Sequence, residues 1–351
     1  MPQSPEPLVS VVTPVYNGEA TIAECIASVL NQRYTNFEYV IVNNCSTDRT
    51  SAILESFASR DPRIRIHSNT EFLTALQNQN FAMRLVSPES RYCKVVHADD
   101  WLFPECISQM VELAETDPSI GIVGSFMLHG PFVYCDGLPP PVGGEGNQYP
   151  TAVFPGREIC RIDLHRTGRP SVLGNPTTIL LRSSLILERE EPFYDERHLF
   201  MDRDVCFRIL QEHNFGFVYQ VLSFMRRHEG QLHSFMHRVH TFKASQLYLL
   251  VTYGPSCLDR DEYEALLREK LSTYRAFLKR NSLRRIPFRK HKEFWDYHLR
   301  YLQLAGYPVT KTRLVWYATS ELLDIILNPK QALEMLWRKL RRQRNTAIRK
   351  H

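Results

Sequence analysis

The chain has 351 residues, of which 43% are hydrophobic and 23% charged, and its formal net charge is +5. These fractions are typical of a globular protein, and they exclude a largely disordered chain and a collagen-like one. The length predicts two domains, or one large domain with an appendage. No uncharged apolar run approaches the ~20 residues of a membrane-spanning helix.

The charge is distributed unevenly along the chain. Residues 1–239 carry 20 Lys+Arg against 28 Asp+Glu, a net of −8, whereas residues 240–351 carry 23 against 10, a net of +13. Such a change indicates two regions with different roles. The acidic region is a candidate catalytic domain. The basic region is suited to an anionic surface, which could be membrane lipid, nucleic acid or a polyanionic acceptor.

The eight cysteines are scattered, and no two of them have the C-x-x-C spacing of a zinc ribbon or a thioredoxin-like site. The first seven residues are polar and proline-rich, without the apolar core of a signal peptide. Both features predict a reducing, cytoplasmic location.

Strand and helix patterns alternate through the first third of the chain, and two strands and a helix follow further on. Ile22, Ile26, Val29 and Leu30 recur with helical spacing after the β-branched run at 8–13. Strands are predicted at 8–13, 37–42, 64–67, 92–98, 121–125, 177–181 and 215–222, with helices at about 22–30, 48–60, 75–86, 104–116 and 202–211. This order predicts an α/β fold with a doubly wound, mostly parallel sheet.

Two further regions interrupt or follow this pattern. Residues 130–157 are rich in proline and glycine, and either a lid over a ligand or a passive surface loop fits them. From about residue 235 the pattern is helical, with helices predicted at 235–252, 260–280, 288–305, 311–327 and 329–349. The predicted domains are therefore residues 1–235, catalytic, and residues 236–351, basic and mostly helical.

Polar residues follow the predicted strands at the carboxyl edge of the sheet, where open parallel sheets bind ligands. Pro14, Tyr16 and Glu19 follow the first strand, without the glycine pattern of a dinucleotide site or a P-loop. Asn43 and Asn44 follow the second. The adjacent carboxylates Asp99 and Asp100 follow the fourth, and such hard oxygen ligands suit Mg²⁺ or Mn²⁺ carrying a diphosphate.

A second carboxylate pair, Asp202 and Asp204, opens the predicted helix at 202–211. Acidic residues in the first turn of a helix are ordinary capping residues. One of the two could instead face the cleft as a general base.

Four motifs in this order resemble glycosyltransferase family 2, whose fold is the GT-A type. The stretch SVVTPVYNGEATIAECIASVLNQRYTNFEYVIVNNCSTDRT is similar to the opening of that family, with its P-x-Y-N turn and S-T-D-x-T loop. KVVHADDWLFPECI, FMDRDVCFRIL and RRHEGQLHS resemble its metal, catalytic-base and closing segments. The resemblance covers about residues 8–235.

The resemblance implies a role for each matching residue. Pro14, Tyr16, Glu19, Asn43 and Asn44 would form the nucleoside pocket, and Asp99 would contact the donor diphosphate. Asp99, Asp100 and His228 would hold a divalent cation, Mn²⁺ or Mg²⁺. Asp202 would be the catalytic base, supported by Asp204. This chain departs from the family pattern at Asn43–Asn44 and at His97, because the family often has aspartates at these positions.

The implied function is an inverting glycosyltransferase of the hexosyltransferase type. It would move a sugar from a nucleoside diphosphate sugar, with a UDP-sugar favoured, to a hydroxyl of a glycan or lipid-linked acceptor in polysaccharide or glycolipid synthesis. A catalytically silent relative that binds nucleotide-sugar or acts as a scaffold is an alternative, supported by His97 and the two asparagines. A nucleic-acid binder built on the basic tail is a third alternative. For the implied transferase, no nucleic acid is expected as a partner.

The last 22 residues bear on location. Residues 330–351 carry eight Lys+Arg and one acid, and Leu333, Leu336, Trp337 and Leu340 share a face if the segment is helical. A basic amphipathic helix of this kind can lie in the interface of an anionic membrane, at the inner face of the cell membrane. Packing of the same stripe on the preceding helices is the alternative.

Overall fold

The computed structural model describes residues 6–139, 149–166, 171–197, 200–226, 235–236, 238–285 and 288–327. The chain divides into two compact units. The first comprises residues 1–229 with 253–259, and the second comprises residues 230–252 with 260–351.

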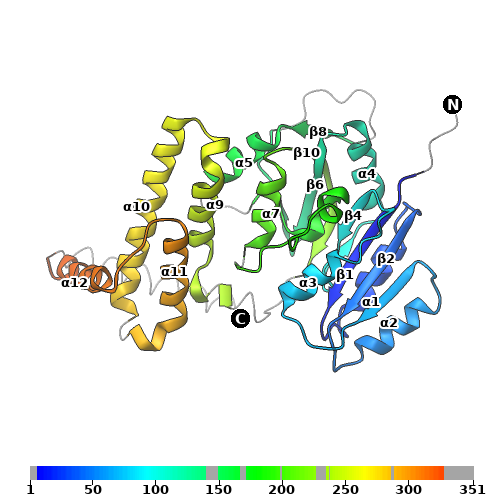
Figure 1. Cartoon of the computed structure of the whole chain (residues 1–351), viewed down its shortest axis with the longest axis horizontal. Helices are drawn as coiled ribbons and strands as arrows, with labels where there is room; N and C mark the ends of the chain where they lie inside the picture. Colours follow the sequence, from blue (N-terminus) through cyan, green and yellow to red (C-terminus); the bar gives the residue numbers. More distant parts are fainter. Residues whose placement is uncertain are drawn as a thin grey trace. The chain divides into compact units, whose positions relative to one another are not determined.

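The first unit is built on one mixed sheet (Figure 1). Its order is β3-β2-β1-β4-β9-β6-β10-β5, with β7 paired to β6 and β8 to β10. The strands are β1 (Val9–Val15), β2 (Phe37–Asn43), β3 (Ile64–Ser68), β4 (Tyr92–Val95), β5 (Trp101–Leu102), β6 (Ile120–His129), β7 (Phe132–Tyr134), β8 (Thr151–Phe154), β9 (Ile179–Arg182) and β10 (Asn214–Met225).

The long ladders of this sheet are parallel. β3, β2, β1 and β4 run parallel to one another, and β6 runs parallel to β10. β9 lies antiparallel between β4 and β6 and joins the two parallel parts. The predicted α/β class, with a mostly parallel sheet and a helical C-terminal region, is therefore confirmed.

Helices cover both faces of the sheet. α4 and α7 lie on opposite sides of β6 and β10 (Figure 1). The apolar faces of α1, α2 and α4 share one buried core with alternate residues of β1 and β2. The helices of this unit are α1 (Ile22–Leu30), α2 (Thr50–Ala58), α3 (Ala75–Met83), α4 (Cys106–Thr116), α5 (Gly156–His165), α6 (Ser184–Leu187) and α7 (Met201–Ile209), with the 3-10 turn η1 (Pro176–Thr178).

The second unit is helical. The described helices that lie wholly within it are α10 (Arg260–Arg284), α11 (Lys292–Leu304) and α12 (Lys311–Leu327), with the 3-10 turn η2 (Phe288–His291). His298 of α11 is fully buried, where Nδ1 lies 2.5 Å from the Tyr274 hydroxyl and Nε2 lies 2.8 Å from the Val239 carbonyl. No helix within the described ranges is long and apolar enough to cross a membrane.

Helix α9 (Phe242–Cys257) differs most from its predicted bounds of 235–252. His240 has a φ of +60°, a left-handed conformation that interrupts a right-handed helix, so α9 begins after it. The helix runs past Gly254 and includes Pro255 near its end, where only one main-chain hydrogen bond is lost. The helix predicted at 329–349 lies outside the described residues.

Candidate functional site

The carboxyl ends of β1, β2 and β4 meet at one edge of the sheet, because these strands are parallel neighbours. The turn after β1 is fastened to the loop after β2. Asn17 has a φ of +49°, and its side-chain oxygen accepts a hydrogen bond from the Thr47 N–H at 2.8 Å. The Glu19 N–H donates to Asp48 Oδ2 at 3.0 Å. The P-x-Y-N turn and the S-T-D-x-T loop therefore form one wall of the site.

Glu19 and Pro14 have distinct places in this wall. Glu19 Oε2 accepts from the Arg49 main-chain N–H at 3.1 Å and from its Nε at 3.3 Å. Pro14 lies within β1 opposite Val42. Glu19 thus orders the loop after β2, and Pro14 fixes the strand that leads to Tyr16.

Two exposed aromatic rings face each other at the same edge. The rings of Tyr16 and Phe72 are 4.9 Å apart, edge to face, and 49% and 61% of the two residues is exposed. A flat nucleobase can stack on such rings. Phe72 was not among the sequence-predicted site residues, because it lies in the connection from β3 to α3 and belongs to no motif.

Asn43 and Asn44 are buried, and both amides already have protein partners. Asn43 donates to Ser51 Oγ at 2.9 Å and accepts from the Ser46 N–H at 3.2 Å. Asn44 donates to the Leu73 carbonyl at 2.8 Å and accepts from the Leu73 N–H at 3.0 Å. Asn44 therefore holds the segment that presents Phe72, which places it behind the Tyr16–Phe72 pair.

The carboxylates predicted to bind metal cluster after β4. One potential ligand atom from each of His97, Asp99 and Asp100 lies within 4.8 Å of the others. Two carboxylates beside an imidazole fit a divalent cation of the Mg²⁺ or Mn²⁺ type, because carboxylate oxygens are the ligands such ions favour. The third predicted ligand, His228, lies outside the described residues.

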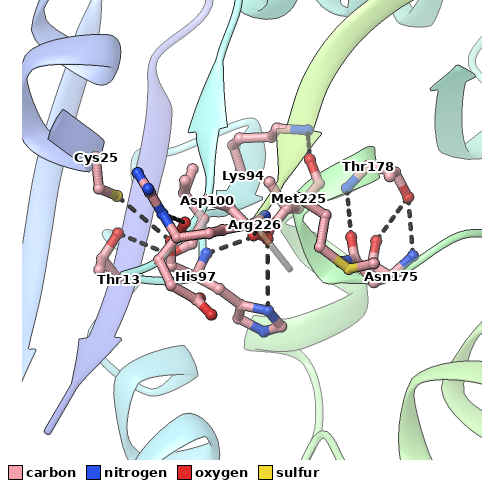
Figure 2. A network of polar contacts seen from close by, with 12 residues as sticks. Thr13, Cys25, Lys94, His97, Asp100, Asn175, Thr178, Met225 and Arg226 are labelled. Atoms are coloured by element: carbon pink, nitrogen blue, oxygen red, sulfur yellow. Dashed lines mark hydrogen bonds and ion pairs between the residues drawn. The ribbon is translucent and has the colours of Figure 1, made fainter. Parts of the chain in front are cut away.

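Asp100 is the buried member of this cluster (Figure 2). Its Oδ2 accepts from the Thr177 hydroxyl at 2.7 Å, and its Oδ1 accepts from the Arg226 N–H at 3.2 Å. Burial raises the pKa of Asp100 to about 6; His97 opposes this rise, and Asp99 adds to it. A bound cation would offset the cost of burying this charge.

Asp202, at the start of α7, is the second carboxylate with a raised pKa. Burial is the main cause, and the imidazole of His97 lowers the pKa of Asp202 as it does that of Asp100. His97 thus acts electrostatically on both carboxyl groups. Asp202 Oδ1 is buried and has no hydrogen-bond partner among the described residues. An oxygen of this kind is free to accept a proton from a substrate.

Asp204 has a different environment one half-turn further along α7. It is 5% exposed, and its Oδ1 accepts from the Tyr253 hydroxyl at 2.9 Å. Between the two aspartates, Arg203 forms an ion pair with the fully buried Asp163 of α5. α7 is therefore anchored on both sides of its first turn, with Asp202 left as the carboxylate without such an anchor.

Thr177 and Arg226 were missed by the sequence analysis. Thr177 lies in η1 and is 77 residues from the Asp100 it contacts, and Arg226 is 126 residues away. Arg226 also forms an ion pair with Glu24 and lies 5.2 Å over the Trp101 ring. Only the RRHEGQLHS segment, which begins at Arg226, gave a signal for either residue.

Comparison with known proteins identifies the first part of the chain. The profile of the family described as "Glycosyl transferase family 2" matches residues 10–140. This part of the chain is therefore similar to glycosyl transferase family 2 domains. The matched residues include Tyr16, Asn44, Asp99 and Asp100, whereas Asp202 and Asp204 lie beyond them.

Curated relatives resemble the same part of the chain. An uncharacterized glycosyltransferase of Haemophilus influenzae is 36% identical over 121 residues, which are 34% of this chain and 37% of the relative. The teichuronic acid biosynthesis glycosyltransferase TuaG of Bacillus subtilis is 32% identical over 124 residues, 35% of this chain and 48% of TuaG. The alignments thus span between about a third and a half of these curated relatives.

A solved structure extends the similarity in fold beyond the matched residues. Residues 1–349 of S. aureus TarS, in complex with UDP-GlcNAc, superpose with a TM-score of 0.60 and 15% identity, covering 92% of each chain. At this identity the match concerns the fold alone. It confirms the predicted GT-A type of sheet followed by C-terminal helices.

Proposed function

We propose that this protein is an inverting glycosyltransferase that moves a sugar from a nucleoside diphosphate sugar to an acceptor hydroxyl. The observation that carries the proposal is that two groups occur together. One is the cluster of His97, Asp99 and Asp100. The other is Asp202, which has an oxygen without a hydrogen-bond partner among the described residues and a pKa that the His97 imidazole lowers. A transferase needs both a site for the leaving diphosphate and a base for the acceptor.

The donor is proposed to be a UDP-sugar. Tyr16 and Phe72 are suited to stack on its base, while Pro14 and Glu19 shape the wall beside it. The side-chain amides of Asn43 and Asn44 already have protein partners. We therefore propose that these two residues mainly hold the wall of the pocket in place, and that their contact with the base is secondary. The UDP-GlcNAc complex of TarS, which shares the fold, supports a UDP-sugar as the first donor to test.

Asp99 and Asp100 are proposed to hold Mn²⁺ or Mg²⁺, with His228 as a further ligand. Such an ion, when bound, stabilises the negative charge that develops on the leaving diphosphate. Asp99 and Asp100 supply the hard oxygen atoms, and the Thr177 hydroxyl and Arg226 N–H fix the orientation of Asp100.

Asp202 is proposed to be the general base. As the acceptor oxygen bonds to the anomeric carbon, its proton passes to Asp202 and the anomeric C–O bond to the diphosphate breaks. Attack from the face opposite the leaving group inverts the configuration at that carbon. Asp204 supports this step by fixing α7 through Tyr253.

The acceptor is proposed to be a glycan or lipid-linked glycan in surface polysaccharide or glycolipid synthesis. The similarity to TuaG, a teichuronic acid biosynthesis glycosyltransferase, supports the polysaccharide class. Residues 1–235 are proposed as the catalytic domain. Residues 236–351 are proposed as a basic region that places the enzyme at the inner, cytoplasmic face of the membrane.

An exposed apolar face on α12 supports this membrane contact. Trp316, Leu323 and Ile326 are 60%, 56% and 62% exposed, and Val315, Leu322 and Leu327 are exposed beside them. Their spacing places them on one side of the helix. The net charge of +13 over residues 240–351 is complementary to anionic lipid.

A second candidate, binding of nucleotide-sugar without transfer, is favoured by His97 in place of an aspartate. The experiment that separates the two is release of UDP from a panel of UDP-sugars with Mn²⁺ and candidate acceptors. The transferase predicts turnover that Asp202→Asn abolishes. Binding of UDP without turnover, for any sugar or acceptor, would favour the silent relative.

A further inference from the structure

Lys94 of β4 is a fully buried lysine close to the carboxylate cluster (Figure 2). Its Nζ donates to the main-chain carbonyls of Thr177 at 2.7 Å and Ile179 at 3.1 Å, and it lies 3.6 Å from the sulfur of Met110. No carboxylate pairs with it among the described residues. Burying an amine in this way is costly, and a leucine or methionine would fill the same volume without that cost.

The Ile179 carbonyl belongs to the first residue of β9 and the Thr177 carbonyl to η1, and neither residue is in the ladder between β9 and β4. The ladder between β4 and β9 ends at the pair Cys93–Leu181. Beyond this pair, no main-chain ladder joins β4 to the segment before Leu181. There, Nζ of Lys94 makes the connection by donating to the Ile179 and Thr177 carbonyls. Lys94 thus fixes the distance between the end of β4 and η1.

Thr177 of η1 in turn contacts the proposed metal site twice. Its hydroxyl donates to Asp100 Oδ2 at 2.7 Å and accepts from the His97 N–H at 3.1 Å. The hydroxyl can make both bonds only while η1 stays at its present distance from β4. A shift of about 1 Å would lengthen the 2.7 Å bond to Asp100 Oδ2 beyond hydrogen-bonding distance.

We propose that Lys94 is a positioning residue for the metal- and diphosphate-binding carboxylate Asp100, acting through η1 and the Thr177 hydroxyl. This rests on the proposed function of the Asp99–Asp100 site. Lys94 touches neither metal nor substrate. It directs one oxygen of Asp100 toward Thr177, so that the orientation of the carboxylate is set before the ligand arrives.

The test is a double-mutant cycle on Mn²⁺ binding by the full chain. The probe is Mn²⁺ in the presence of UDP, with free Mn²⁺ followed by electron paramagnetic resonance. Lys94→Met and Thr177→Val are each expected to weaken binding about tenfold, the effect of losing one hydrogen bond to a charged group. The double variant should be little weaker than either single one, because both changes remove the same connection.

Two variants separate positioning from general stability. Thr177→Ser keeps the hydroxyl and should bind Mn²⁺ nearly as the natural chain does. Cys93→Ala removes buried volume at the neighbouring position of β4, and should lower the melting temperature with Mn²⁺ affinity unchanged. If Lys94→Met does not fold, Lys94→Leu, which also lacks an N–H donor, replaces it in the cycle.

Three results would overturn the proposal: a Lys94 variant with unchanged Mn²⁺ affinity, additive losses near a hundredfold in the double variant, or an equal loss in Cys93→Ala. Failure of the proposed function gives a different result. In that case the natural chain itself shows no UDP-dependent Mn²⁺ binding.

Discussion

The Tyr253 hydroxyl donates a hydrogen bond to Asp204 Oδ1 at 2.9 Å, and this bond distinguishes the two aspartates of α7. Asp204 is fixed by a neighbour within the first unit, whereas Asp202 Oδ1 has no hydrogen-bond partner among the described residues. Two carboxylates two residues apart in sequence therefore have different environments, and this difference supports the proposal of Asp202 as the general base.

Asp202→Asn should bind UDP-sugar about normally yet lose transfer by about 10²–10⁴-fold, the usual effect of removing a positioned general base. Turnover by UDP release and affinity by calorimetry check the two parts. Asp204→Asn and Tyr253→Phe should do less harm, because both only loosen α7. A dead Asp204→Asn beside an active Asp202→Asn would reverse the assignment.

Phe72→Ala should weaken UDP binding by about 5–150-fold, since stacking of a base on an aromatic ring contributes about 1–3 kcal/mol. The affinity for uridine should fall by the same factor as the affinity for UDP, because the Phe72 ring is proposed to contact the base and not the phosphates. Phe132→Ala removes a ring of similar exposure from β7 and serves as the control. Equal affinity in Phe72→Ala and the natural chain would exclude the stacking role.

His298 should make the helical unit acid-sensitive. Burial is the main cause that lowers its pKa from 6.5 to about 4. The unfolded chain therefore binds a proton more readily between these values, and stability is lost as the pH falls from about 6.5 to 4. The loss is on the order of 3 kcal/mol.

Urea unfolding at a series of pH values measures this loss. His298→Gln keeps a donor for the Val239 carbonyl and an acceptor for Tyr274, and removes the titrating group. The variant should show a flatter dependence of stability on pH in this window. The same slope in both proteins would assign the acid sensitivity to other groups.

The exposed face of α12 and the basic residues 330–351 should bind the protein to vesicles rich in anionic lipid. Salt should release it, because charge attraction is screened over roughly 10 Å at 0.1 M. Trp316→Ser should weaken sedimentation, and removal of residues 330–351 should abolish it with the fold retained. A truncated chain that unfolds, or a full-length chain indifferent to anionic lipid, would favour packing of the last segment on the preceding helices.

The sequence predicts the parallel strands and the helices between them because their apolar spacing is local. β9 was predicted at 177–181, but the pattern gave no indication that it runs antiparallel between β4 and β6. The site divides in the same way. Asp99, Asp100 and Asp202 follow from motifs, whereas Thr177, Phe72 and Lys94 depend on contacts between distant segments.

Asn44 illustrates a further limit. Its position after β2 predicted a contact with the nucleoside, and its type alone could not indicate that the Leu73 main chain would occupy both ends of the amide. A buried amide forms whichever hydrogen bonds the fold brings to it. The motif therefore locates the wall of the proposed donor pocket, and the structure is needed to say which atoms have no protein partner.

Calorimetry of UDP binding with and without Mn²⁺ tests the metal-dependent donor site most directly. The natural chain should bind UDP tightly only when Mn²⁺ is present. Asp99→Asn and Asp100→Asn should each lose most of this Mn²⁺-dependent affinity and keep the far-ultraviolet circular dichroism of the fold, because each removes one charged ligand of the cation. Mn²⁺-dependent affinity that is unchanged in both variants would contradict the proposed site.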